Sequence, residues 1–310
     1  MASPCATMSR LLDRRAFRPR APRRGRRLPP RAPVASGAET STSAPPIPFK
    51  APPRTCTSAA SEARAVLRAL REGAASGDAS VPRRVRVELP LPPADRDTDD
   101  LVYLGLHGQA ADWSGGMQQR FRVTKGYVED AMLDGYDHEY LGLLDRDADG
   151  MGVWRVGENM TAVAHPSDVT VGFFLRLLRG EYGDAVLDPS HVVVVVNAFW
   201  SGNGERVGQP WEFGLKREAR EVLGRDGDWD KVYCCRRARS AAGVEGTLVR
   251  SWPGPWRLYD ARGTRVVLET ETEPSNRAMG EALNEAAGAR EAAGFNRDAA
   301  ECSRDDDCIT

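Results

Sequence analysis

The segment HVVVVVNAF, residues 191–199, decides the fold class of this sequence. Five consecutive valines without polar alternation predict a strand that is buried on both faces, which is usual for an interior strand of an α/β sheet. A helical pattern over residues 167–180 precedes this strand, and a second helix is predicted over residues 211–223. The alternation of helix and strand therefore predicts that the valine segment belongs to the parallel core of a sheet.

Further helix and strand patterns extend from this segment in both directions. Upstream helices are predicted over residues 58–73 and 117–133, and upstream strands over residues 83–90, 140–144 and 160–166, of which the last two read as buried. Downstream, four strand-like segments are joined by short links that contain Gly or Pro, which is typical of an antiparallel meander. A final amphipathic helix is predicted near Ser275–Ala293.

Together these elements predict one three-layer α/β domain over residues 58–295. Its sheet is expected to be mixed, with parallel core strands and a C-terminal antiparallel meander. Residues 1–57 are predicted to be a disordered transit peptide and linker, and residues 296–310 a polar flexible tail.

The charge of the chain is unevenly distributed. Residues 1–60 hold twelve basic residues and only two acidic ones, Asp13 and Glu39, and they run into the polar, Pro-containing stretch SGAETSTSAPPIP. This composition is typical of an organellar transit peptide, and by itself it does not separate plastid from mitochondrion. The alternative is a disordered basic arm that binds nucleic acid or anionic lipid.

The rest of the chain is acidic, with 31 of the 43 basic residues and 42 of the 44 acidic residues. An acidic body argues against nucleic acid as the main partner, because phosphate binding requires clustered cations. No stretch approaches the roughly 20 apolar residues that span a bilayer. We therefore expect a protein that does not bind nucleic acid and is not transmembrane.

The stretch LLDRDADGMGVW, residues 143–154, resembles a calcium-binding loop because Asp145, Asp147 and Asp149 alternate. An EF-hand loop also requires a bidentate Glu at its twelfth position, where this sequence has Val156. We therefore predict a polar turn without a high-affinity calcium site. The four histidines show no metal-binding spacing, so no metal and no cofactor is predicted.

Catalytic motifs are missing from the sequence, which leaves open whether the protein is an enzyme. Nucleotide-binding fingerprints, phosphate-binding loops, nucleophile elbows and zinc-protease motifs do not occur in the required setting. Gly115 and Gly116 precede a predicted helix whose free N–H groups attract anions, and Arg120 lies one turn further on. The alternative is that these glycines only permit close packing at the helix start.

Two polar residues stand where predicted strands end. Asn197 follows the valine strand, and His165 ends another strand. In open α/β sheets, ligands bind beyond the carboxyl ends of parallel strands. Both residues are therefore candidate ligand-binding residues by position, although a histidine at such a place more often satisfies only a loop hydrogen bond.

Four tryptophans are candidates for contact with a protein partner, because partly exposed indoles are enriched in interfaces. They are Trp200, Trp211, Trp252 and Trp256. The alternative for the last two, in the stretch SWPGPWRLY, is that they cover a rigid turn between strands.

Two pairs of cysteines lead to different expectations. Cys234 and Cys235 are adjacent in a strand pattern, so their thiols are predicted to point to opposite faces of the sheet. Cys302 and Cys308 lie in the polar tail, where they are candidates for a redox-regulated disulfide. The alternative is that these tail cysteines stay unpaired.

Several stretches occur here in a characteristic order: SGGMQQRFR, then VVVVVNAFW followed by GQPWEFG, then VRSWPGPWRLY. With them the chain resembles, over about Ser58 to Glu273, a plastid domain-of-unknown-function family of plants, algae and cyanobacteria. Related domains occur at the C-terminus of a chloroplast adenylate kinase and in a low-photosystem-II-accumulation protein. The chain departs from the family where Ala198 stands in place of the Pro that often follows Asn197.

The resemblance implies a chloroplast protein of the stroma, or one associated with the thylakoid. It implies an accessory role, such as aid to photosystem assembly or maintenance, with a photosystem or other thylakoid protein as partner. The alternative is an enzyme or sensor that binds a phosphorylated metabolite or nucleotide in an α/β cleft. The family supplies no catalytic residues that could be transferred to this chain.

Overall fold

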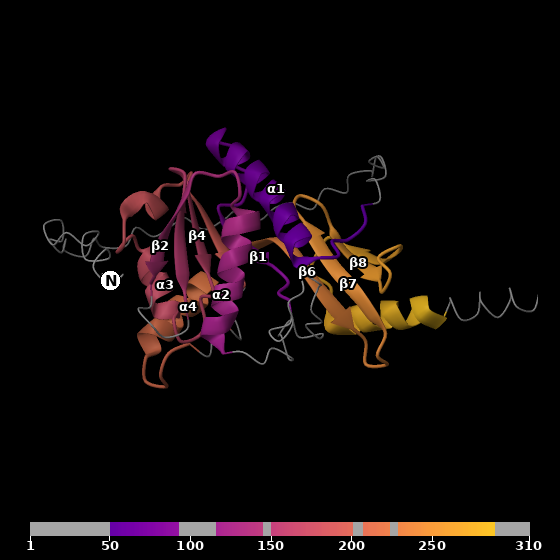
Figure 1. Ribbon diagram of the computed structural model, residues 1–310. Coiled ribbons are helices and arrows are strands. Elements are labelled where there is room, and N and C mark those ends of the chain that lie inside the picture. The colour runs from indigo at the N-terminus through magenta and orange to yellow at the C-terminus, as the bar shows by residue number, and fades with distance from the viewer. Residues whose placement is uncertain (1–49, 93–115, 145–149, 201–206, 224–228, 289–310) are drawn as a thin grey trace, which may run out of the picture. The chain divides into compact units, whose positions relative to one another are not determined.

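The computed structural model describes residues 50–92, 116–144, 150–200, 207–223 and 229–288. The chain divides into two units, Met1–Pro48 and Phe49–Thr310, and every described residue belongs to the second. In the described part, nine strands form one mixed sheet in the order β2-β3-β4-β5-β1-β6-β7-β8-β9 (Figure 1). The predicted α/β class and mixed sheet are confirmed.

The centre of the sheet is parallel. Its four strands are β4 (Met160–Ala164), β5 (Val192–Val196), β1 (Arg84–Glu88) and β6 (Trp229–Arg239), in this spatial order. Each neighbouring pair is parallel. All five valines of β5 are buried, as predicted for a strand covered on both faces.

Antiparallel strands extend the sheet on both sides. On one side β3 (Gly152–Val156) pairs with β4, and β2 (His138–Leu143) forms the edge. On the other side β7 (Glu245–Ser251), β8 (Trp256–Asp260) and β9 (Val266–Thr270) form the predicted meander. The prediction that β2 is buried was wrong, because an edge strand leaves every second side chain more exposed.

One face of the sheet is covered by α1 (Cys56–Ala75), α2 (Met117–Tyr127) and the π-helix η3 (Val128–Met132). Figure 1 shows α1 and α2 in front of the strands. The helix predicted over residues 117–133 thus exists, but its last turn is a π-helix. We call this side of the sheet the front face.

The other face of the sheet, which we call the back face, is covered by further helices. They are α3 (Val171–Leu178), the short 3-10 helix η4 (Asp184–Leu187), α4 (Phe213–Leu223) and residues 276–288. Thr170 is the N-cap residue of α3, so the helix begins after the start of the predicted range 167–180. Among the described residues no helix is both long and apolar enough to cross a membrane.

The folded domain begins upstream of the predicted boundary at Ser58. Thr55 caps α1, and its hydroxyl and that of Ser58 form a reciprocal capping box. The hydroxyl of Tyr259 donates a hydrogen bond of 2.9 Å to the carbonyl of Lys50. Residues from Lys50 onward are therefore part of the domain.

The two adjacent cysteines of β6 point to opposite faces, as predicted. Cys235 belongs to the core under α1, whereas Cys234 packs with Met279 and Leu283 on the back face. Both thiols are fully buried and unoxidised. Burial raises the pKa of each thiol, so both remain protonated and unreactive at neutral pH.

Candidate functional site

The carboxyl ends of β4, β5 and β1 meet at one edge of the sheet, and two predicted residues lie there. His165 directly follows β4, and its N–H donates a 2.9 Å hydrogen bond to the carbonyl of Val196. Asn197 directly follows β5, and its N–H donates a 2.9 Å hydrogen bond to the carbonyl of Val87. The parallel ladders therefore hold both residues side by side at the edge where α/β proteins bind ligands.

Both residues have an unusual backbone conformation. Among the described residues other than glycine, only His165 and Asn197 have a positive φ, at 59° and 49°. This left-handed region costs roughly 1–2 kcal/mol for a residue with a Cβ atom. The Asn197 side-chain oxygen offsets part of that cost by accepting a 2.8 Å hydrogen bond from the N–H of Leu89, beyond the end of β1. Such strained positions concentrate at functional sites.

Helix α2 places two side chains against these strand ends. Thr124 Oγ1 lies 2.8 Å from His165 Nε2, and both side chains are fully buried. The Arg120 guanidinium lies 4.1 Å from the ring centroid of Phe199, and the His165 ring meets the same phenyl ring edge-on at 5.0 Å. Arg120, Thr124, His165, Asn197 and Phe199 therefore form one cluster, which we call the strand-end site.

The strand-end site is positively charged, and no described residue compensates its charge. Burial lowers the pKa of Arg120 to about 10, so the guanidinium stays charged at neutral pH. Burial, with a smaller contribution from nearby Arg120, lowers the pKa of His165 to about 3, so the imidazole is neutral. No carboxylate forms an ion pair with Arg120 within the described part of the chain.

Three buried nitrogen atoms of the site have no hydrogen-bond partner among the described residues. They are Arg120 Nε, His165 Nδ1 and Asn197 Nδ2. A buried polar group without a partner costs about 1–3 kcal/mol, so native proteins rarely leave several together. Arg Nε and Asn Nδ2 are donors only. The site is therefore suited to a molecule that presents acceptor oxygens.

The described groups of the strand-end site are suited to ligand binding. A general acid or base works best with a pKa near the operating pH, and the pKa of His165 is about 3. In the described ranges no three His, Cys, Asp or Glu side chains are grouped closely enough to hold a metal ion. The residues can hold and orient an oxygen-rich ligand.

The sequence identified three members of the site but missed two. Arg120, His165 and Asn197 come together, and Gly116 is the N-cap residue of α2, one turn before Arg120. Gly115 lies outside the described residues. Thr124 and Phe199 were missed, although Thr124 falls on the buried stripe that also contains Phe121.

The four candidate tryptophans do not form one exposed surface. Trp256 is only 2% exposed, whereas Trp211 is 70% exposed. Trp200 packs against Phe174 on the back face, and Trp252 packs against the front-face core. Of this group Trp211 is the one whose indole is largely accessible.

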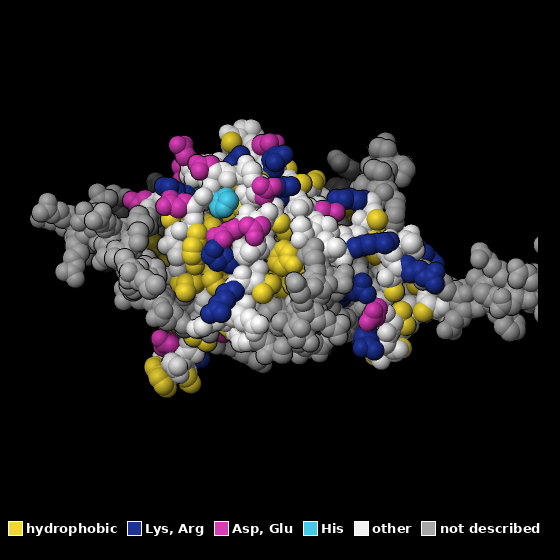
Figure 2. All heavy atoms as spheres, viewed as in Figure 1, with side chains coloured by type: hydrophobic (Ala, Val, Ile, Leu, Met, Phe, Trp, Pro, Cys, Tyr) yellow, Lys and Arg dark blue, Asp and Glu magenta, His cyan; other side chains and the backbone are white. Residues whose placement is uncertain are grey.

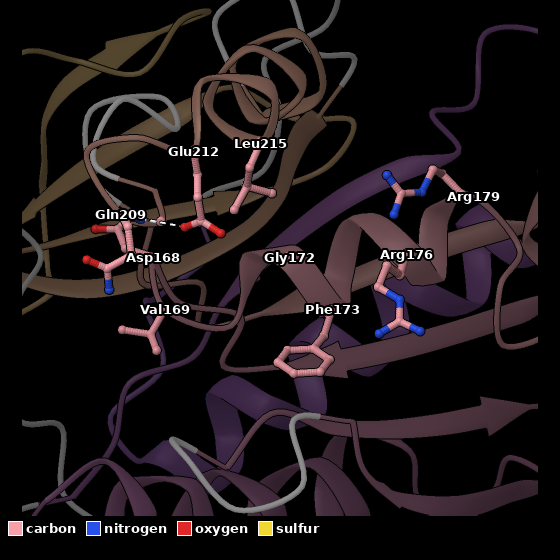
Figure 3. Close-up of a pocket in the computed structure, with 10 residues that line it drawn as sticks. Asp168, Val169, Gly172, Phe173, Arg176, Arg179, Gln209, Glu212 and Leu215 are labelled. Carbon is pink, nitrogen blue, oxygen red and sulfur yellow. Dashed lines mark hydrogen bonds between the residues drawn. The ribbon is translucent and has the colours of Figure 1, made fainter.

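A shallow hollow of about 510 Å³ lies between α3 and α4 (Figure 3). Its apolar lining includes Val169, Phe173 and Leu215. The polar groups at its rim are already paired: Arg179 binds both carboxylate oxygens of Glu218 at 2.9 Å, and the N–H of Gln209 donates to Glu212 at 2.6 Å. The hollow therefore lacks the unpaired polar groups found at the strand-end site.

The segment before α4 carries exposed aromatic side chains next to this hollow. Trp211 and Phe213 flank the lining residue Glu212 in sequence and are 70% and 76% exposed. Figure 2 shows hydrophobic side chains at the tip of this segment, which projects at the lower left. Elsewhere in that view acidic and basic side chains are intermingled.

Two further sets of predicted residues lie outside the described part of the chain. They are the tail cysteines, Cys302 and Cys308, and the aspartates of the calcium-like loop, Asp145, Asp147 and Asp149. The expectations for a redox-regulated disulfide and for the absence of a calcium site stay predictions.

A comparison with protein families assigns most of the chain. The family described as a domain of unknown function, DUF1995, matches residues 53–281. Comparisons with curated proteins and with solved structures gave no match. The matched region contains every described element from β1 to β9 and all residues of the strand-end site. The chain therefore belongs to the DUF1995 family.

Proposed function

We propose that this protein binds a small oxyanion, a carboxylate or a phosphate monoester, at the strand-end site. The observation that carries the proposal is the set of three buried, unpartnered nitrogens on Arg120, His165 and Asn197. Two of the three are obligate donors, and each requires an acceptor oxygen. An oxyanion supplies several such oxygens at once.

The charge of the site supports an anionic ligand over a neutral one. Arg120 is a half-buried guanidinium without a carboxylate partner in the described ranges, and its planar fork matches carboxylate and phosphate oxygens. The phenyl ring of Phe199 supports the guanidinium from one side at 4.1 Å. Binding an anion here would neutralise a half-buried charge, which favours the complex.

Binding, rather than turnover, is the function that this chemistry supports. The neutral His165 is held by Thr124 and can orient a ligand, but its low pKa makes it a poor proton carrier at neutral pH. We therefore place this protein among metabolite-binding or sensing domains, the alternative to an accessory role that the sequence left open.

The test is a thermal-shift titration with inorganic phosphate, glycerol 3-phosphate and malonate. A ligand that binds only the folded protein raises the unfolding temperature, and the rise grows with the logarithm of the ligand concentration above the dissociation constant. We expect Arg120→Gln to abolish the shift and Arg122→Gln, an exposed residue of the same helix, to preserve it. A full shift in the Arg120→Gln protein would refute the proposal.

An accessory role in the plastid is the second candidate function. It is favoured by the exposed Trp211 and Phe213 beside the α3–α4 hollow, because exposed aromatic residues suit a protein partner such as a thylakoid protein. The basic N-terminus supports import into an organelle, and the family resemblance favours the chloroplast. Pull-down from chloroplast extract with wild-type, Trp211→Ala and Arg120→Gln proteins separates the two functions. Loss of partners only with Trp211→Ala would favour the accessory role.

A further inference from the structure

A second group of charged side chains lies on the back face of the sheet. Along β1, Val85 and Val87 face the front core, so Arg84, Arg86 and Glu88 point to the back face. The pairing of β1 with β6, and of β6 with β7, places further charged residues beside these side chains. The group, which we call the basic cluster, contains Arg84, Arg86, Lys231, Arg236 and Arg250 with the carboxylates of Glu88 and Glu273.

Cations outnumber carboxylates in the basic cluster. Glu88 lies 2.7 Å from Lys231 and 3.6 Å from Arg236, and Glu273 lies 2.8 Å and 3.1 Å from the same two residues. Arg86 also lies 3.8 Å from Glu88, so three cations share these two carboxylates. Arg250 forms no ion pair with any described carboxylate. The cluster therefore carries an excess of positive charge within an otherwise acidic body.

Several donors of the basic cluster are buried and have no described partner. They are Arg86 Nε, Arg250 Nε and the indole nitrogen of Trp256, a residue that is only 2% exposed. Trp256 stands opposite Arg250 in the β7–β8 ladder, and Arg250 stands opposite Cys234. All three of these atoms are donors, so the cluster is suited to a ligand that presents acceptor oxygens.

Aromatic side chains hold these cations in place. The Arg86 guanidinium lies 5.1 Å from the Trp200 ring centroid, and both Lys231 and Arg250 lie 5.4 Å from the Trp256 centroid. Cation–π contacts at this range position a cation without neutralising it. The cations are therefore held in fixed positions while keeping their charge for a ligand.

We propose that the basic cluster binds a compact ligand with two or more linked phosphate groups. Arg86 on β1 and Arg250 on β7 are separated by β6, so their backbones lie at least about 10 Å apart at the usual spacing between strands. Linked phosphates spread their oxygens over a longer span than a single phosphate does, which suits cations carried on different strands. Guanidinium groups bind phosphate oxygens in pairs, which suits a cluster built mainly of arginines.

A compact ligand fits better than a long polyanion. The cluster covers only three neighbouring strands, and the rest of the body is acidic and would repel an extended nucleic acid. The proposal is independent of the strand-end site, where one guanidinium suits a single oxyanion.

The test is calorimetric titration of the full chain with sodium tripolyphosphate and, in a second series, with ATP. We expect binding that weakens with added salt. Arg86→Gln and Arg250→Gln should each weaken binding about tenfold or more. Arg277→Gln, an 87% exposed residue outside the cluster, should leave binding unchanged. Arg250→Lys, which keeps the charge, should retain part of the affinity, and thermal melts will confirm that each variant is folded.

Comparing the two titrations shows whether the ligand is a nucleotide or a phosphate chain. The Arg120→Gln variant distinguishes binding at the basic cluster from binding at the strand-end site. Tighter binding of ATP than of tripolyphosphate would support a nucleotide ligand, and equal binding would support a phosphate chain alone. Arg120→Gln should leave tripolyphosphate binding unchanged, whatever its effect on the inorganic phosphate shift. The proposal fails if folded wild-type protein does not bind tripolyphosphate, or if Arg86→Gln and Arg250→Gln bind it as tightly as Arg277→Gln. Binding of an oligothymidylate that tripolyphosphate cannot displace would instead indicate a nucleic-acid surface.

Discussion

Replacing Glu88 by Gln will show how far one carboxylate stabilises the charged back face. Burial alone would raise the pKa of Glu88, but Lys231, Arg236 and Arg86 together lower it from the ordinary 4.5 to about 2. At about 1.4 kcal/mol for each pKa unit, that difference corresponds to roughly 3 kcal/mol of folded-state stabilisation at neutral pH. The Glu88→Gln protein also leaves those cations less compensated, so we expect a loss of at least about 3 kcal/mol.

The sign of the pH dependence follows from the lowered pKa. The stabilisation is complete above the unfolded value of 4.5 and is lost as the pH falls toward about 2. The difference in stability between wild-type and Glu88→Gln proteins should therefore shrink across this range. Urea unfolding followed by tryptophan fluorescence, at neutral pH and at several acidic pH values, measures that difference.

A matched control uses an exposed ion pair. Glu281 pairs with Arg277 at the surface, where both side chains are more than half exposed. Exposed pairs contribute at most about 1 kcal/mol, so Glu281→Gln should change stability little. If Glu88→Gln were as stable as Glu281→Gln at neutral pH, the reasoning about the buried cluster would be refuted.

Three further predictions concern buried or terminal groups. Burial lowers the pKa of His165 from 6.5 to about 3, so the neutral imidazole stabilises the fold above pH 6.5, and this stabilisation is lost as the pH falls toward 3. In the His165→Gln protein the free energy of unfolding should therefore depend less on pH between 6.5 and 3. An unchanged pH dependence would contradict this prediction. The thiols of Cys234 and Cys235 should resist iodoacetamide in the folded protein and react after unfolding, as mass spectrometry can show, because burial raises both pKa values. The mature protein should begin at or before Lys50, because the carbonyl of Lys50 accepts a hydrogen bond from the hydroxyl of Tyr259. N-terminal sequencing that finds a later first residue would overturn this prediction.

The sequence predicted elements whose patterns are local and missed properties that depend on neighbours. The valine segment of β5 predicted burial on both faces, because continuous apolar character is visible in one strand. β2 carries a similar apolar run, but its place at the sheet edge exposes it, and edge position is not encoded in the strand itself. In β1 the alternation of valine with charged residues is visible in the sequence. That its charged side chains are half-buried follows only from the central place of β1 in the sheet.

The candidate site shows the same division. Positions at strand ends predicted His165 and Asn197, because the carboxyl ends of parallel strands share one edge. Their contact with Thr124 and Phe199 depends on how α2 packs across the strand ends, and the spacing of residues along the sequence does not predict that packing. The basic cluster was missed for a related reason. β1 and β6 lie more than 140 residues apart in the sequence, and their charged side chains meet only because the two strands pair in the sheet.

The central position of β1 has a consequence for how this chain folds. β1 is the first strand in sequence, yet its partners β5 and β6 begin at Val192 and Trp229, more than 100 residues later. Closing such long loops costs entropy before any pairing compensates it, and sheets with distant partners fold slowly. During synthesis Arg84–Glu88 must therefore wait with both hydrogen-bonding edges unpaired until Val192–Val196 has left the ribosome, and with one edge unpaired until Trp229–Arg239 has followed. This interval is when the chain is most exposed to aggregation, and it gives chaperones a definite segment to protect.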